Sequence, residues 1–73
     1  MERYRNSGGD SGIVSYEIGE NYIKVLFSDQ KTYTYTYSSA GQYHIEHMKS
    51  LARRGSGLNG YINQNVKYKY ARR

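Results

Sequence analysis

Two β-strand patterns and the turn between them occupy residues 22–37, which read YIKVLFSDQKTYTYTY. In the first pattern Ile23, Val25 and Phe27 share one face, and over residues 32–37 threonine alternates with tyrosine. A period of two is typical of a strand with one buried face, and threonine and tyrosine both favour strands. The short polar stretch 28–31 predicts a turn, so we expect the two strands to be antiparallel neighbours.

A further strand is expected on the N-terminal side. Apolar and polar side chains alternate over residues 13–18, and residues 19–21 have the composition of a turn. Strands at 13–18, 22–27 and 32–37 would form a three-stranded antiparallel meander. Tyr33, Tyr35 and Tyr37 would share one face of the last strand, and we expect at least two of them to lie in the core.

Beyond residue 40 the apolar spacing becomes helical. Ile45, Met48 and Ala52 form one stripe, which predicts a helix that starts at Ser39 or Gly41 and stops at Gly55. Residues 58–64 are expected to form a short helical turn, and residues 66–70 a short strand or an extended tail. The predicted fold class is α+β: a three-stranded antiparallel β-meander packed against one amphipathic helix, with a short C-terminal helical turn and a strand or tail.

The length of 73 residues allows one domain with a thin core, which disfavours most enzymes. We expect a flexible N-terminal arm over residues 1–12, a single α+β domain over residues 13–70 and a disordered basic tail over residues 71–73. The absence of cysteine excludes disulfides and thiolate zinc sites, and fits a reducing compartment. The longest apolar run is three residues, and residues 1–10 do not resemble a signal peptide, so we expect a cytoplasmic protein without a membrane partner.

The sequence contains no complete catalytic or cofactor-binding motif. Residues 55–60 read GSGLNG and match G-x-G-x-x-G, but a predicted helix precedes them and no acidic residue follows. His44 and His47 would share a helix face, yet two imidazoles make only half of a zinc site, so we expect solvated histidines. The sequence has no G-x-S-x-G elbow for a hydrolytic serine. We therefore predict a protein without catalysis, cofactor, metal or small-molecule substrate.

The charge is unevenly distributed along the chain, whose net charge is +5. Residues 1–48 carry four basic and six acidic side chains, whereas residues 49–73 carry seven basic and none that is acidic. Such a field favours an acidic partner, either nucleic acid or an acidic protein surface, and charge alone does not distinguish them.

Ten tyrosines accompany this charge, and several stand beside arginine or lysine. Tyrosine offers rigid contact area at low entropic cost, and arginine is common where binding energy is concentrated. The predicted partner-binding residues are Arg3, Tyr4, Arg5, Arg53, Arg54, Lys67, Tyr68, Lys69, Tyr70, Arg72 and Arg73.

Several core and turn positions form a recognisable set: Ser11-Gly-Ile13 with Tyr16, Ile23-x-Val25-x-Phe27, Tyr33-x-Tyr35, Leu51–Ala52, Gly55, Leu58–Asn59, Ile62 and Tyr68-x-Tyr70. This set resembles the KTSC domain. That family occurs as small stand-alone bacterial proteins and at the C-terminus of some lysyl-tRNA synthetases, so the resemblance implies a binding module without catalysis. This sequence lacks the proline that usually follows the third strand, and its threonine–tyrosine strand is longer.

In size and charge the whole chain is also similar to small phage-encoded transcription regulators that bind bacterial RNA polymerase. This resemblance implies action in the bacterial host cytoplasm, by weakening sigma-factor attachment at initiation, by antitermination near the RNA exit channel, or both. A partner strand added to an exposed sheet edge is one expected docking mode. The alternative is a module that binds single-stranded RNA or tRNA with tyrosines as stacking platforms, and direct contact with RNA or DNA is compatible with either function.

Overall fold

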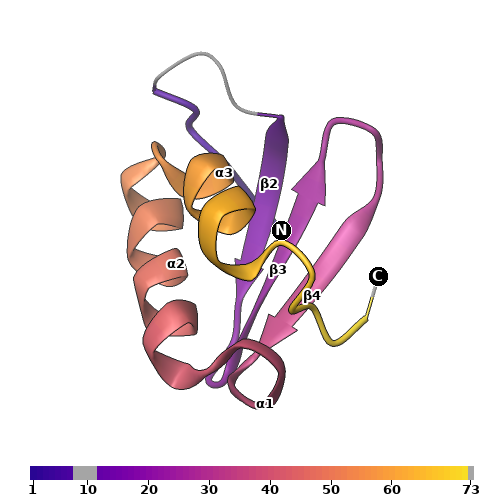
Figure 1. Ribbon diagram of the computed structural model, residues 1–73. Helices are drawn as coiled ribbons and strands as arrows, with labels where there is room; N and C mark the ends of the chain where they lie inside the picture. Colours follow the sequence, from indigo (N-terminus) through magenta and orange to yellow (C-terminus); the bar gives the residue numbers. More distant parts are fainter. Residues whose placement is uncertain (8–11, 73) are drawn as a thin grey trace.

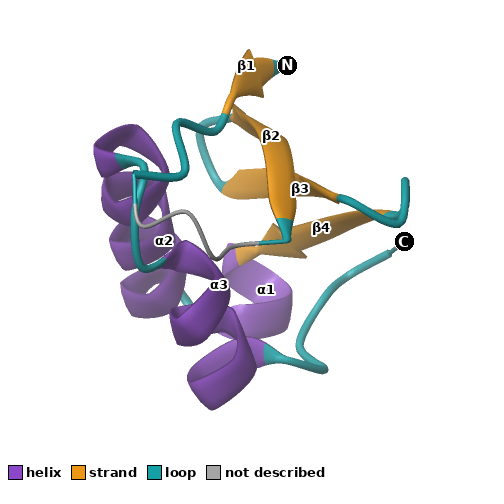
Figure 2. Cartoon of the chain, turned by 90° about the horizontal axis from the view of Figure 1, so that it is seen from above, coloured by secondary structure: helices purple, strands orange, loops and turns teal. Residues whose placement is uncertain are grey.

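The computed structural model describes residues 1–7 and 12–72 and confirms an α+β fold. A four-stranded antiparallel sheet packs against one main helix, and the helices lie together on one side of it (Figures 1 and 2). The strands are β1 (Glu2–Arg3), β2 (Ile13–Ile18), β3 (Tyr22–Phe27) and β4 (Thr32–Thr36). The helices are α1 (Tyr37–Ala40), α2 (Gln42–Arg54), α3 (Leu58–Tyr61) and the π-helix η1 (Ile62–Val66). No helix in the described ranges is long and apolar enough to cross a membrane.

The predicted meander is present as β2, β3 and β4, with β1 added beside β2. Glu2 pairs with Tyr16 and Arg3 pairs with Ser15, so the sheet has four strands rather than three. The prediction of a flexible arm is therefore wrong for residues 1–7, and residues 8–11 of that arm lie outside the described residues. A two-residue strand gives no period-two signal, which is why the sequence pattern missed it.

The third predicted strand ends one residue early, because a helix begins at Tyr37. Thr36 caps α1: its side chain accepts a hydrogen bond from the Ser39 backbone, and the Ser39 hydroxyl binds the Thr36 N–H in return. Tyr37 consequently leaves the sheet. Only Tyr35 is fully buried, while Tyr33 and Tyr37 are half-buried against the core, so the expected pair of core tyrosines is not met.

Helix α2 starts after Gly41 and ends at Gly55, as the spacing predicts. Its buried residues include the stripe Ile45, Met48 and Ala52, which covers the apolar face of the sheet. Gly55 has φ +80°, a left-handed conformation that side chains with a Cβ adopt at a cost.

The C-terminal part returns to the sheet. Leu58 and Ile62 enter the core from α3 and η1, as expected, and the chain then runs to the outer edge of β4. There the Thr34 N–H donates to the Arg72 carbonyl at 2.8 Å, and the Ala71 N–H donates to the Thr34 carbonyl at 2.6 Å. The prediction of a disordered tail is wrong for residues 71 and 72, and Arg73 lies outside the described residues.

We expect Gly55→Ala to destabilise the protein by about 1–2 kcal/mol or more. A Cβ at Gly55 would stand 2.5 Å from the Cβ of Arg5, in addition to the strain of a positive φ. Gly60→Ala is the matched control, because Gly60 lies in α3 and a Cβ there has open space around it. Urea unfolding followed by circular dichroism should show Gly60→Ala neutral or stabilised by about 0.5–1 kcal/mol. Equal stability of the two variants would contradict the packing of the arm on Gly55.

Candidate partner-binding surface

The N-terminal arm crosses the end of α2 and is held there by its backbone and by Tyr4. The Tyr4 N–H donates to the Val14 carbonyl at 3.0 Å, and the Ser7 N–H donates to the Gly55 carbonyl at 2.7 Å. The Tyr4 hydroxyl accepts from the Leu58 N–H at 3.3 Å, and the Tyr4 side chain is 3% exposed. Tyr4 is therefore part of the core, and its prediction as a contact residue for a partner is wrong.

This arrangement brings three predicted arginines together. Arg5 lies against Gly55, the residue that directly follows Arg53 and Arg54 at the end of α2. We call Arg5, Arg53 and Arg54 the helix-end cluster. All three are exposed, and none makes an ion pair with a described residue, although Arg54 Nε donates to the Ser56 hydroxyl at 3.2 Å.

Other predicted residues lie elsewhere on the molecule. Lys67, Tyr68 and Lys69 follow η1 and are exposed, and Tyr68 is 78% exposed with the Lys67 Nζ 5.5 Å from its ring centre. Arg72 is exposed at the β4 edge. We call Lys67, Tyr68, Lys69 and Arg72 the C-terminal group. Figures 1 and 2 show that the C-terminal end and α2 lie on opposite sides of the molecule, so the structure separates two basic regions that the sequence treats as one set.

Two more predicted residues differ in their placement. Tyr70 is half-buried and packs edge to face against Tyr33, with ring centres 4.9 Å apart, and against Tyr35 at 6.4 Å. Part of its ring is thus used in packing, and its role as a partner contact stays a prediction. Arg3 is exposed on β1, where it pairs with Ser15 of the neighbouring strand β2.

The sheet edges offer less room for a partner strand than the sequence suggested. On β4, both backbone polar groups of Thr34 bind residues 71 and 72, and the Thr36 N–H binds the Ser39 hydroxyl. The other edge strand, β1, has two residues. Short or covered edges oppose the addition of a partner strand, so strand addition is not part of the function proposed below.

Lys49 belongs to the basic C-terminal part by sequence but does not face solvent. Its side chain is buried, and Nζ donates to the Glu20 carbonyl and to Glu46 Oε2, both at 2.9 Å. The hydrogen bonds from Lys49 and from the Tyr37 hydroxyl hold the pKa of Glu46 below its usual range. This cation is used within the fold, which leaves fewer basic groups for a partner than the sequence count implies.

The two histidines of α2 contact Tyr61 rather than solvent alone. His44 Nδ1 lies 2.6 Å from the Tyr61 hydroxyl, and the His47 ring stacks on Tyr61 with ring centres 4.5 Å apart. Tyr61 belongs to α3, and no local sequence pattern indicates a contact across 17 positions. Within residues 1–7 and 12–72, no group of three histidine, aspartate or glutamate side chains could hold a metal ion.

Burial raises the pKa of Tyr35 to about 12, with smaller contributions from the phenols of Tyr33 and Tyr70. A raised phenol pKa means that folding favours the neutral form of Tyr35. The contribution of this group to the stability of the folded protein is complete below about pH 10 and is lost as pH rises towards 12. Chemical denaturation across this interval should therefore show a smaller loss of stability in Tyr35→Phe than in the unmodified protein. Tyr68→Phe, which removes the hydroxyl of an exposed ring, is the control. If Tyr35→Phe lost as much stability over this pH interval as the unmodified protein does, the raised pKa of Tyr35 would be refuted.

Comparisons of the chain with protein-family models, with curated proteins and with solved structures gave no match.

Proposed function

We propose that this protein is a non-catalytic regulator that binds an acidic surface of a bacterial RNA polymerase through the helix-end cluster. The observation that carries the proposal is the meeting of Arg5 with Arg53 and Arg54, three exposed guanidinium groups without an ion pair to any described residue. The resemblance of the whole chain to small phage-encoded regulators supports the identity of the partner. The resemblance to the KTSC domain supports a binding module.

The packing of the arm supports a preorganised binding surface. Arg5 stands between Tyr4, which is anchored in the core, and Ser7, which is hydrogen-bonded to Gly55. Arg53 and Arg54 are fixed on the last turn of a 13-residue helix. Groups held in place before binding lose less conformational entropy when the partner arrives.

Arginine suits a carboxylate-rich protein surface. The planar guanidinium forms paired, charge-assisted hydrogen bonds with carboxylates, and arginine is enriched among the residues that dominate interface energies. In the proposed function the protein acts in the bacterial host cytoplasm. Occupying the polymerase there weakens sigma-factor attachment, causes antitermination near the RNA exit channel, or does both.

A pull-down with tagged protein from host-cell lysate tests the proposal. It is run with and without nuclease, at about 50 mM and about 200 mM salt. We expect polymerase subunits to be recovered in the nuclease-treated samples at the lower salt. Recovery of RNA alone, lost after nuclease treatment, would overturn the proposal and favour a single-stranded RNA-binding module.

A further inference from the structure

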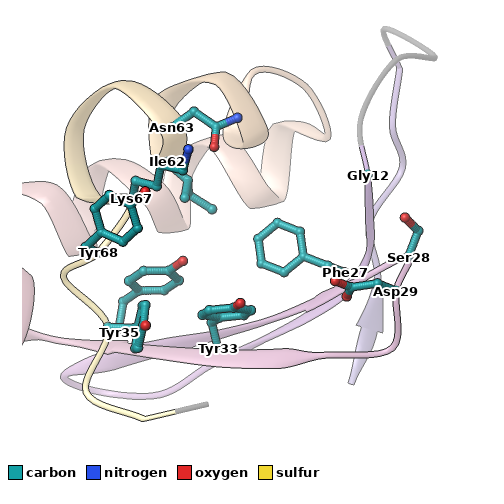
Figure 3. A pocket seen from close by; sticks show the side chains of 11 residues that line it. Gly12, Phe27, Ser28, Asp29, Tyr33, Tyr35, Ile62, Asn63, Lys67 and Tyr68 are labelled. Carbon is teal, nitrogen blue, oxygen red and sulfur yellow. The ribbon is translucent and has the colours of Figure 1, made fainter.

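An aromatic cavity opens between the β3–β4 hairpin and the C-terminal part of the chain. Its volume is about 310 Å³. Phe27 and Tyr33 lie on its sheet side, and Ile62, Asn63 and Lys67 lie across from them (Figure 3). Tyr35, Tyr68 and Tyr70 complete the aromatic lining. Most of these rings pack in or against the hydrophobic core, but the described residues do not fill the space between them.

The rings stand nearly perpendicular to one another. Phe27 and Tyr33 have ring centres 5.4 Å apart at 87°, and Tyr33 and Tyr70 have ring centres 4.9 Å apart at 79°. An edge-to-face contact covers one face of one ring in each pair, so aromatic surface remains for a planar guest. Tyr68, 78% exposed at the mouth, adds a ring that can close over such a guest.

The cavity also offers polar groups to a guest. Tyr35 lines the cavity, and its hydroxyl makes no hydrogen bond with a described residue, although no side-chain nitrogen or oxygen of the described residues is both fully buried and without a partner. This hydroxyl can therefore bind a guest but does not require one. At the mouth, Asp29 Oδ1 accepts from the Lys31 backbone N–H, while no described residue donates to Oδ2. A guest with N–H and carbonyl groups on a flat ring would match these groups.

Charge favours one class of guest. Lys67 and Asp29 are the charged residues that line the cavity, and Lys67 is exposed without an ion pair to a described residue. The lining itself is thus balanced, and the net charge of +5 over the whole chain favours an anion over an ammonium ligand. We propose that this cavity binds one unpaired nucleotide of a single-stranded nucleic acid, its base among the tyrosines and its phosphate beside Lys67.

This site is independent of the polymerase proposal, because it uses different residues on a different part of the molecule. Fluorescence anisotropy with fluorescein-labelled eight-nucleotide single strands of RNA and of DNA tests it on the full chain at about 50 mM salt. A duplex of the same sequence is the control for attraction by charge alone. The RNA and DNA strands show which of the two sources the cavity accepts.

Tyr68→Ala should weaken binding of the preferred single strand by at least about fivefold, since one base–aromatic stack is worth that much or more. Tyr43→Ala is the matched control: Tyr43 is 76% exposed, lies on α2 and is not among the cavity residues. It should change the affinity less than twofold. Lys67→Gln should lower the slope of log affinity against log salt by about one.

Three results would overturn the assignment. They are equal weakening by Tyr68→Ala and Tyr43→Ala, duplex binding as tight as single-strand binding, and no binding of either strand at the lower salt. None of these results bears on polymerase binding, which is measured in samples freed of nucleic acid. Conversely, loss of polymerase binding would leave the oligonucleotide measurements unchanged.

Discussion

Tyr4→Ala should unfold the protein or destabilise it by about 3–5 kcal/mol, the usual cost of truncating a buried aromatic side chain. A chain of this length has a total stability of only about 4–11 kcal/mol, so the loss is a large share of it. The physical reason is that Tyr4 fills a core position and its hydroxyl accepts from the Leu58 N–H at the start of α3. Urea unfolding monitored by far-ultraviolet circular dichroism measures the effect.

Two further variants separate packing from the hydrogen bond. Tyr4→Phe keeps the ring and removes the acceptor for Leu58, which should cost about 1–3 kcal/mol. Tyr43→Ala removes an equally large but exposed side chain and should change the stability by about 0.5 kcal/mol or less. If Tyr4→Ala were as stable as Tyr43→Ala, residues 1–7 would not be packed into the fold.

The double variant Arg53→Ala/Arg54→Ala should bind RNA polymerase at least about tenfold more weakly than the unmodified protein, a loss of roughly 1.4 kcal/mol or more. Alanine favours helix, so α2 should persist and the change should isolate the two guanidinium groups. Affinity is measured by biolayer interferometry against immobilised polymerase after nuclease treatment.

Lys31→Glu is the matched control, because it lowers the net charge from +5 to +3, as the double alanine variant does. Lys31 is exposed in the turn between β3 and β4, which lies away from α2 (Figure 1). This control should retain an affinity within about threefold of the original, because remote charges act mainly through screened, long-range attraction. Equal losses in the two variants would mean that net charge, rather than the helix-end cluster, determines binding.

Local periodicity was sufficient to predict the core of the fold. The alternation in residues 13–18 and 22–27 and the stripe Ile45, Met48 and Ala52 each depend on residues close in sequence, and the structure confirms all three. Gly55 was predictable as the helix end because a left-handed C-terminal residue is a common role for glycine. The end of β4 at Thr36 was harder to predict from the sequence, because the Thr36–Ser39 capping box has serine where glutamate or glutamine is usual.

The candidate site depends on contacts that no local pattern contains. Tyr4 reaches Leu58 across 54 positions, and this contact both buries a predicted partner-binding residue and places Arg5 beside the end of α2. Lys49 likewise donates a hydrogen bond to the carbonyl of Glu20, 29 positions away, and is buried by that contact rather than exposed to a partner. Composition correctly indicated a surplus of cations, but their division into the helix-end cluster and the C-terminal group required the tertiary structure.

Titration of the fluorescently labelled protein into purified, nucleic-acid-free RNA polymerase core enzyme of the host cell is the most direct test of the proposed function. At about 50 mM salt we expect saturable binding with one molecule per core enzyme, weakened when sigma factor is already bound. The absence of saturable binding to the core enzyme at this salt would contradict the proposed function.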